Sequence, residues 1–149
     1  MRHVFSERLV NDMEPVLKIF YDSLKNDKKI LGLRCKECGQ VEFPPVPVCN
    51  SCSGMDMEWV EMSGEAELVS FTFNALGMAP YHMRPTVIGF GRTKEGNMFA
   101  STLLDVGYAD QPALLERLRN GRVPLKMEIG SLCEEVDFPM YRLMEEDEK

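Results

Sequence analysis

The sequence predicts a mainly β fold that consists of a leading helix, a four-cysteine ribbon and a five-stranded barrel. Three observations lead to this prediction. Two CxxC pairs lie close together, a helical stripe of apolar residues precedes them, and strand-like segments fill most of the remainder. We therefore expect an N-terminal helical arm at 1–29, the ribbon at 30–62, the barrel at 63–143 and an acidic tail at 144–149.

The ribbon is predicted from the spacing of its cysteines. Cys35 and Cys38 form one CxxC pair, Cys49 and Cys52 form the other, and ten residues separate the two pairs. Two intervening residues allow a turn to place both sulfurs of a pair on one side, and four thiolates suit a closed tetrahedral Zn²⁺ site. The gap is shorter than the about fifteen to twenty residues of the common template, but a short hairpin fits in it. We expect a structural zinc site in a rubredoxin-like ribbon.

The sequence contains neither an apolar stretch of membrane-spanning length nor the pattern of a secretory signal. We therefore expect a cytoplasmic protein without membrane contact. In the reducing cytoplasm, paired CxxC motifs bind metal more often than they form disulfides. The fifth cysteine, Cys133, lies among apolar and acidic residues, which do not favour a reactive thiolate. A half-buried strand residue is the preferred interpretation of Cys133.

Pro15 suits the first turn of a helix that extends to about Asn26. Its apolar residues recur with helical spacing: Leu17, Phe20, Tyr21 and Leu24. Packing on the chain itself and docking on a partner subunit both remain open for this stripe, because a small ribbon offers little surface. Between the cysteine pairs, prolines stiffen the loop VEFPPVPV. Its Phe43, Pro44 and Pro45 are a candidate partner contact or, equally, the cover of the ribbon's own core.

The remainder has the element order of a small barrel. The predicted strands occupy 66–76, 85–93, 97–106, 123–129 and 133–143, with a tight turn at Lys94-Glu95-Gly96 and a helix that Asp110 caps and Gly121 ends. In the first strand, alternation places Val69, Phe71 and Phe73 on one face. Three strands, a helix and two strands are the layout of an OB-fold, a five-stranded Greek-key barrel with its helix between strands three and four.

The charge of the chain is unevenly distributed. The net charge is −7, and residues 134–149 hold seven acids and two bases, which gives this end −5. Residues 84–126 hold seven bases against four acids, which gives this section +3. A phosphate-bearing small ligand suits the middle section, whereas a long polyanion such as DNA is disfavoured by the acidic whole.

The ribbon and barrel motifs together resemble a known family, the acyl-CoA-associated OB-fold/zinc-ribbon proteins, long catalogued as a domain of unknown function. The resemblance covers about Pro15 to Leu143, and the matching residues are Arg34-Cys35-Lys36-Glu37-Cys38-Gly39, Phe43-Pro44-Pro45, Cys49-Asn50-Ser51-Cys52, Trp59, Ser63-Gly64, Val69-Ser70-Phe71-Thr72 and Glu95-Gly96. The loop that carries His82 and Arg84 and the acidic tail depart from the family pattern.

The resemblance implies a subunit of a hetero-oligomer rather than an enzyme on its own. Members of the family commonly stand beside thiolases, ketoacyl synthases or thiolase-like aldolases, where they stabilise the catalytic subunit and help to form its acyl-CoA site. The implied setting extends to anaerobic degradation of aromatic compounds, such as toluene by way of benzylsuccinate. From charge and loop position, we place Arg84, Arg92 and Lys94 near the phosphates of coenzyme A as a hypothesis; solvated surface residues are the alternative.

The residue content also indicates that the catalytic residues belong to a partner subunit. Thiolase chemistry needs an activated cysteine and acid–base histidines, and the chain has only His3 and His82. An alternative function is binding of single-stranded nucleic acid, with Phe71, Phe73 and Phe90 stacking on bases. Their expected positions inside the barrel and the acidic net charge weigh against it. A stand-alone acyl-CoA-binding protein is a third possibility.

Overall fold

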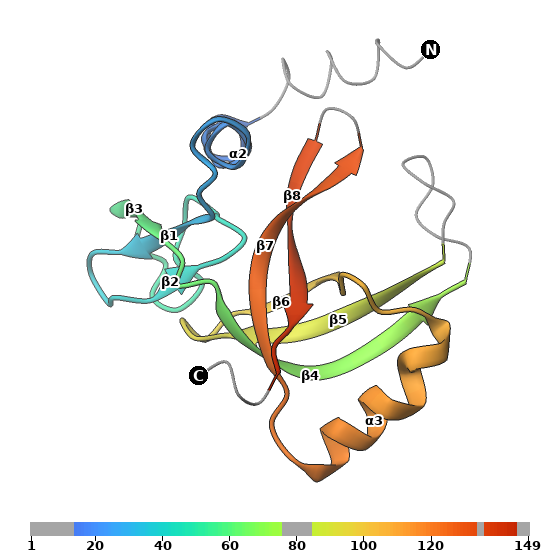
Figure 1. Ribbon diagram of the computed structural model, residues 1–149. Helices are drawn as coiled ribbons and strands as arrows, with labels where there is room; N and C mark the ends of the chain where they lie inside the picture. The colour runs from blue at the N-terminus through green and yellow to red at the C-terminus, as the bar shows by residue number, and fades with distance from the viewer. Residues whose placement is uncertain (1–13, 76–84, 134–135, 146–149) are drawn as a thin grey trace.

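The computed structural model describes residues 14–75, 85–133 and 136–145 of the chain (Figure 1). The described elements follow the predicted order: a leading helix, a small three-stranded sheet, and a five-stranded barrel with one long helix inserted. Helix α2 and the ribbon lie on one side of the barrel, and helix α3 lies at the other end. Among the described helices, none has the length and apolar character needed to cross a membrane.

The leading helix forms where it was predicted. α2 spans Pro15–Asp22 and continues into a short π-helix, η1, at Ser23–Asp27. The carboxylate of Glu14 accepts hydrogen bonds from the first free amides, those of Val16 at 2.9 Å and Leu17 at 3.3 Å. This contact satisfies donors that a helix start leaves without partners.

The ribbon is a three-stranded antiparallel sheet in the order β2-β1-β3. Its strands are β1 (Leu31–Cys35), β2 (Val41–Glu42) and β3 (Met57–Glu61). Leu33 pairs with Glu42 on one side and with Trp59 on the other. Trp59 is half-buried and packs against the core shared with the barrel.

The barrel has the predicted OB-fold topology. Its strands are β4 (Glu65–Asn74), β5 (Thr86–Thr93), β6 (Met98–Thr102), β7 (Pro124–Cys133) and β8 (Val136–Leu143), in the order β6-β5-β4-β7-β8. Leu103 and Tyr141 form a parallel bridge that brings the two edge strands together. Helix α3 (Gln111–Asn120), preceded by the 3₁₀ turn η2 (Tyr108–Asp110), lies between β6 and β7. This arrangement closes a five-stranded barrel with its helix between the third and fourth strands.

Two predictions, one about strand β4 and one about the start of helix α3, were wrong. Val69 does not share a face with Phe71 and Phe73, because the pairing of β4 with β5 shifts between Leu68 and Ser70. A bulge of this kind adds one residue to a strand and reverses the alternation beyond it, so Leu68 is buried and Val69 is 44% exposed. Asp110 precedes α3, but its carboxylate accepts from Gly107 N–H at 2.7 Å instead of from the helix amides.

Helix, ribbon and barrel share one hydrophobic core. A row of aromatic rings shows this directly, with centroid separations of 6.1 Å for Phe20–Phe43, 4.9 Å for Phe43–Phe99 and 5.9 Å for Phe99–Tyr141. The first ring comes from α2, the second from the ribbon, and the last two from the barrel. The ribbon is therefore packed onto the barrel through Phe43, at an orientation that the core fixes.

Candidate metal centre

The four cysteines converge on one point of the ribbon. Their sulfurs all lie within 4.8 Å of one another, although the two pairs come from separate segments. Cys35 ends strand β1, and Cys49 follows the proline-rich loop. Sγ–Sγ distances of 3.6 Å for Cys35–Cys52 and 3.5 Å for Cys38–Cys49 link the two pairs. The first cysteine of each pair is buried and the second is exposed.

Each CxxC pair forms the same tight turn. Gly39 N–H donates to Cys35 O at 2.8 Å, and Ser53 N–H donates to Cys49 O at 2.9 Å. Gly39 and Ser53 occupy the equivalent position, directly after the second cysteine, and both have a left-handed backbone with φ of 78° and 63°. Sequence reasoning did not single out Ser53. Its position relative to the second cysteine, matching that of Gly39, is the signal that identifies it.

The thiols of the cluster perturb one another's pKa values. The backbone N–H of Cys38 holds the pKa of the Cys35 thiol below its ordinary value. For Cys52, the N–H of Gly54 lowers the pKa, but the neighbouring thiols of Cys38 and Cys35 outweigh it and raise the pKa to about 12. The Cys35 thiol therefore loses its proton more easily than the Cys52 thiol does. A cation at the centre would favour the ionised form of all four thiols, because metal ligands are thiolates and metal binding releases their protons.

The donor set fits zinc. Four cysteine sulfurs within one small cluster are the ligands that a tetrahedral structural Zn²⁺ takes. With all four positions filled by protein, no position is left for a water molecule or a substrate. The arrangement therefore suits a metal that holds the fold, and it offers no Lewis-acid chemistry.

The residues predicted to contact a partner divide into two groups. The side chains of Phe20, Leu24, Phe43 and Pro45 are buried within this chain. Leu17 and Pro44 are exposed, and Tyr21 is half-buried. Exposed apolar side chains that sequence reasoning did not name lie nearby along the chain: Ile19, Val46, Val48 and Met55. Among the described residues of the arm and ribbon, these exposed apolar side chains are the ones available for an apolar contact with a partner.

The three cations predicted near coenzyme A do not form a described site. Arg84 lies outside the described residues, as does His82. Arg92 is exposed on β5, and Lys94 forms an ion pair with Glu65 at 3.0 Å. The side chain of Cys133 and the acidic residues from 146 onward also lie outside the described part.

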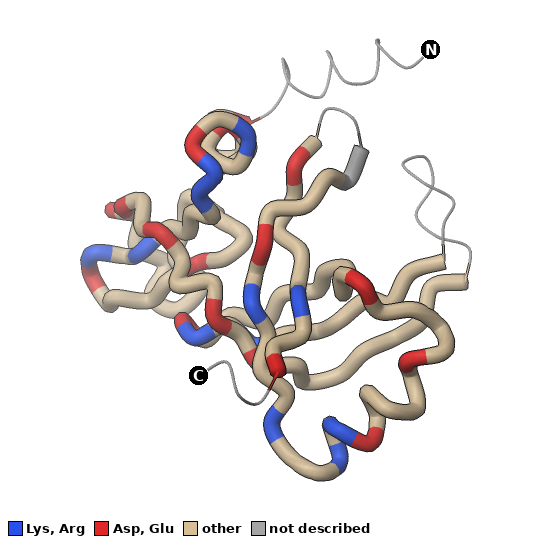
Figure 2. The backbone as a smooth tube through the Cα atoms, viewed as in Figure 1, with Lys and Arg blue, Asp and Glu red and all other residues tan. Residues whose placement is uncertain are grey.

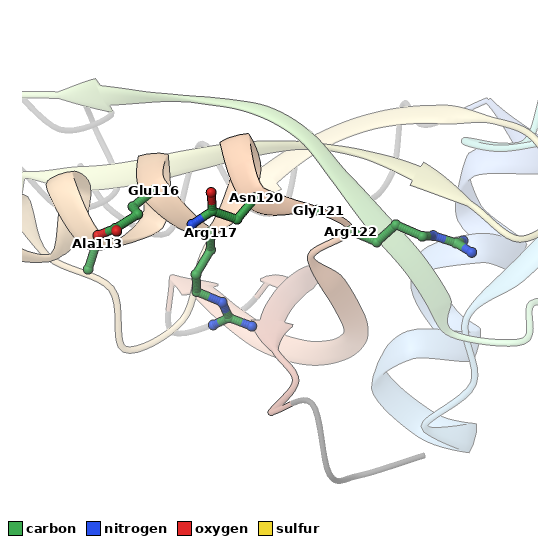
Figure 3. A pocket seen from close by; sticks show the side chains of 6 residues that line it. All are labelled: Ala113, Glu116, Arg117, Asn120, Gly121 and Arg122. Carbon is green, nitrogen blue, oxygen red and sulfur yellow. The ribbon is translucent and has the colours of Figure 1, made fainter.

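Surface grooves lie elsewhere in the described part of the chain, and two of them are considered for a ligand. One lies at the C-terminal end of α3 and includes Arg117 and Arg122, which extend from different positions along its wall (Figure 3). Both cations already have protein partners, since Arg117 donates to Met144 O at 3.0 Å and Arg122 pairs with Glu67 at 2.6 Å. The other groove is apolar and lies between β4 and the start of α3, where Phe71, Tyr108 and Leu115 contribute to its walls.

The surface does not favour the nucleic-acid alternative. Basic residues are interspersed with acidic ones along the described chain and form no continuous stripe (Figure 2). Phe71 and Phe73 are half-buried against the core, as predicted. The predicted position of Phe90 inside the barrel was wrong, because Phe90 is 39% exposed and lies on the outer face of β5. A single-strand binding groove needs both a basic track and exposed aromatic rings.

The fold and the cysteine cluster define a zinc-ribbon protein with an OB-fold barrel. Residues 24–58 match the family model described as "ChsH2, rubredoxin-like zinc ribbon domain". This match agrees with the resemblance that the sequence motifs of the ribbon suggested, and it covers the ribbon alone.

Two relatives show similarity at the level of sequence. A benzoylsuccinyl-CoA thiolase subunit, BbsA, of Thauera aromatica is 46% identical over 48 residues, which cover 32% of this chain and 33% of the relative. A DUF35 domain-containing scaffold protein of Methanocaldococcus jannaschii is 29% identical over 80 residues, which cover 51% of this chain and 55% of the relative. The matches thus span between a third and about half of these relatives.

Two solved structures share the fold. A chain of the Ltp2-ChsH2(DUF35) aldolase superposes with a TM-score of 0.68 at 19% identity and covers 88% of this chain and 96% of its own. A DUF35 protein of unknown function from Sulfolobus solfataricus superposes with a TM-score of 0.57 at 18% identity, with 96% of both chains covered. At these identities the likeness concerns the fold, and it extends beyond the ribbon to the barrel.

Proposed function

We propose that this chain is a non-catalytic, zinc-containing subunit that binds a thiolase-fold catalytic subunit and helps to form its acyl-CoA site. The observation that carries the proposal is the ribbon. Its closed four-cysteine cluster suits a structural metal, and the chain is 46% identical over 48 residues to a subunit of an acyl-CoA thiolase. A ribbon of this kind supports another protein's chemistry, because its metal has no free coordination position.

The exposed apolar residues give the proposal a surface. Met55 is 75% exposed, Val48 is 39% exposed, and the hydrogen bond from Cys49 N–H to Gly54 O at 2.9 Å places their segments side by side. On α2, Leu17 and Ile19 are 38% and 46% exposed. Since zinc and the shared core hold ribbon and helix in place, this surface is presented to a partner in a fixed arrangement.

We also propose that this chain contacts the acyl-CoA itself. Lys94 and Glu65 form an exposed pair, and exposed pairs contribute little stability, so a phosphate can replace the carboxylate at little cost. Arg92 and Arg84 complete the proposed set of cations. We further propose an aromatic acyl group, a cytoplasmic hetero-oligomer and a place in anaerobic aromatic degradation, supported by the thiolase relative alone.

The proposal is tested by reconstitution with the thiolase-fold protein encoded nearest to this chain in its genome. The two proteins are purified together and apart, and acyl-CoA turnover is measured for each preparation. We expect turnover and thermal stability of the catalytic protein to depend on this chain. Full turnover by the catalytic protein alone, with no binding or protection by this chain, contradicts the proposal. The Arg92→Ala variant, which leaves the ribbon intact, separates CoA contact from complex formation.

A further inference from the structure

Glu42 is a buried carboxylate outside the set of cysteine ligands. It lies in β2 with 6% of its surface exposed, and both of its oxygens accept hydrogen bonds from Asn50. Oε1 accepts from the backbone N–H at 2.8 Å, and Oε2 accepts from the side-chain amide at 2.7 Å. Burial of a carboxylate is unfavourable unless hydrogen bonds replace its hydration. Asn50 directly follows Cys49, so this carboxylate is bonded to the second cysteine turn.

The two cysteine turns are attached to the sheet in different ways. The first turn continues β1, where Cys35 pairs with Met57 of β3. The second turn, 49–54, belongs to no strand, and its hydrogen bonds Cys49 N–H to Gly54 O and Ser53 N–H to Cys49 O stay within it. The bidentate contact of Glu42 therefore supplies a direct link from the second turn to the sheet.

We propose that Glu42 is a positioning residue for the metal: it holds the second turn where Cys49 and Cys52 meet the first pair. The residues on either side extend this link to the barrel. Val41 O accepts from Asn97 Nδ2 at 2.8 Å, and the ring of Phe43 lies 4.9 Å from that of Phe99. Loss of a group that orients metal ligands typically weakens metal binding about 10–100-fold. The inference rests on the zinc occupancy that the proposed function assumes.

The test compares zinc release from the full chain into an excess of chelator. Glu42→Leu is expected to release zinc about 10–100-fold faster than the wild type. Glu58→Leu is the matched control, because Glu58 lies in β3 of the same sheet and its exposed carboxylate faces Arg34 at 3.7 Å. Glu42→Gln is expected to restore slow release. The side-chain oxygen of the introduced glutamine can accept from the Asn50 backbone N–H, and its NH₂ group can donate to the Asn50 side-chain oxygen once the Asn50 side-chain amide flips.

A spectrum separates positioning from general stabilisation. In chains loaded with Co²⁺, the absorption bands of the metal–thiolate site are expected to change in Glu42→Leu and to stay unchanged in Glu58→Leu. A residue that only stabilised the ribbon would leave the spectrum of the folded fraction as in the wild type. If Glu42→Leu does not fold, Asn50→Ala replaces it, because Asn50 is exposed and loses only its side-chain hydrogen bond. Faster zinc release is expected there too.

The outcomes distinguish a failure of the positioning role of Glu42 from a failure of zinc occupancy, which the proposed function assumes. A wild-type chain that binds no zinc refutes zinc occupancy, and the inference fails with it. A wild-type chain that binds zinc, while Glu42→Leu or its substitute Asn50→Ala releases it as slowly as the wild type, overturns the positioning role alone.

Discussion

At the scale of the residue, the space beside the cysteine cluster favours a small residue at position 54. Gly54 is buried, its N–H lies 3.4 Å from Cys52 Sγ, and a Cβ built on it would meet the Glu37 carboxyl carbon at 2.9 Å and Cys35 Sγ at 3.1 Å. Glu37 is exposed and can move aside. Cys35 is held by its strand, and a bound metal would hold its sulfur as well, so the sulfur cannot move aside in the same way.

The first prediction concerns Gly54→Ala. We expect the added methyl group to crowd Cys35 and to destabilise the zinc-loaded ribbon by about 1–3 kcal/mol. Zinc affinity and urea unfolding of the loaded chain measure the effect. Gly121→Ala is the control, because its Cβ would meet nothing within 4 Å. Equal stability of the two variants would show that the cysteine turn tolerates a side chain at this position.

The second prediction concerns Tyr141, a fully buried residue whose hydroxyl donates to Phe99 O at 3.1 Å. Burial raises the pKa of this phenol above its ordinary value. The folded chain therefore keeps the proton at a pH where the unfolded chain has lost it, so stability is present below about pH 10 and falls above it. We expect the wild type to lose about 1.4 kcal/mol per pH unit above pH 10 relative to Tyr141→Phe.

Denaturant unfolding of both proteins at pH 8, 10 and 11 measures this difference. Since the two chains share every other titrating group, the difference isolates Tyr141. Parallel curves for wild type and Tyr141→Phe across this range would show that the phenol ionises as easily in the folded barrel as in the unfolded chain.

At the scale of the element, helix α2 belongs to the chain's own core. Phe20 is 3% exposed and Leu24 is 0% exposed, and Phe20 contacts the ribbon ring of Phe43. The sequence predicted the helix and its stripe, because spacing is a local property. It left open which surface the stripe covers, because that depends on contacts with residues far along the chain. The structure shows that the stripe is used internally, apart from its exposed end at Leu17.

The third prediction separates these two uses of α2. Phe20→Ala removes a buried ring and is expected to cost about 3–5 kcal/mol of stability. Leu17→Ala removes an exposed side chain and is expected to change stability by less than about 0.5 kcal/mol. Thermal unfolding measures both variants. On the proposed function, Leu17→Ala should instead weaken binding of the thiolase-fold partner, and unchanged binding would remove α2 from the proposed contact surface.

At the scale of the whole molecule, the sequence predicted more of the parts than of the connections between them. Cysteine spacing and strand alternation are local, and they gave the ribbon and the barrel. Other features depend on tertiary packing, which leaves no fixed spacing in the sequence. They are the bulge after Leu68, the hydrogen bonds of Glu42 with Asn50 and the ring contact of Phe43 with Phe99. These contacts make the ribbon and the barrel parts of one core, so loss of the metal should change the stability of segments outside the ribbon.

The fourth prediction follows from that shared core. Removal of zinc by a strong chelator should unfold the ribbon, since a small metal site is coupled to folding. Because Phe43 connects α2 to the barrel, the helix should loosen as well, whereas the strand pairs β4–β5 and β7–β8 should persist. Amide hydrogen exchange resolves these regions. Uniform exchange throughout the chain would show instead that the barrel needs the ribbon to fold.

The most direct test of the central claim is the mass of the complex with the thiolase-fold partner, measured by size-exclusion chromatography with light scattering. Wild-type chain is expected to co-elute with the partner, and Cys35→Ala or Cys49→Ala, which remove buried metal ligands, are expected to elute apart from it. Loss of activity should follow loss of the complex. A complex of unchanged mass with a metal-free Cys49→Ala chain would contradict the claim that zinc holds the surface by which this protein binds its partner.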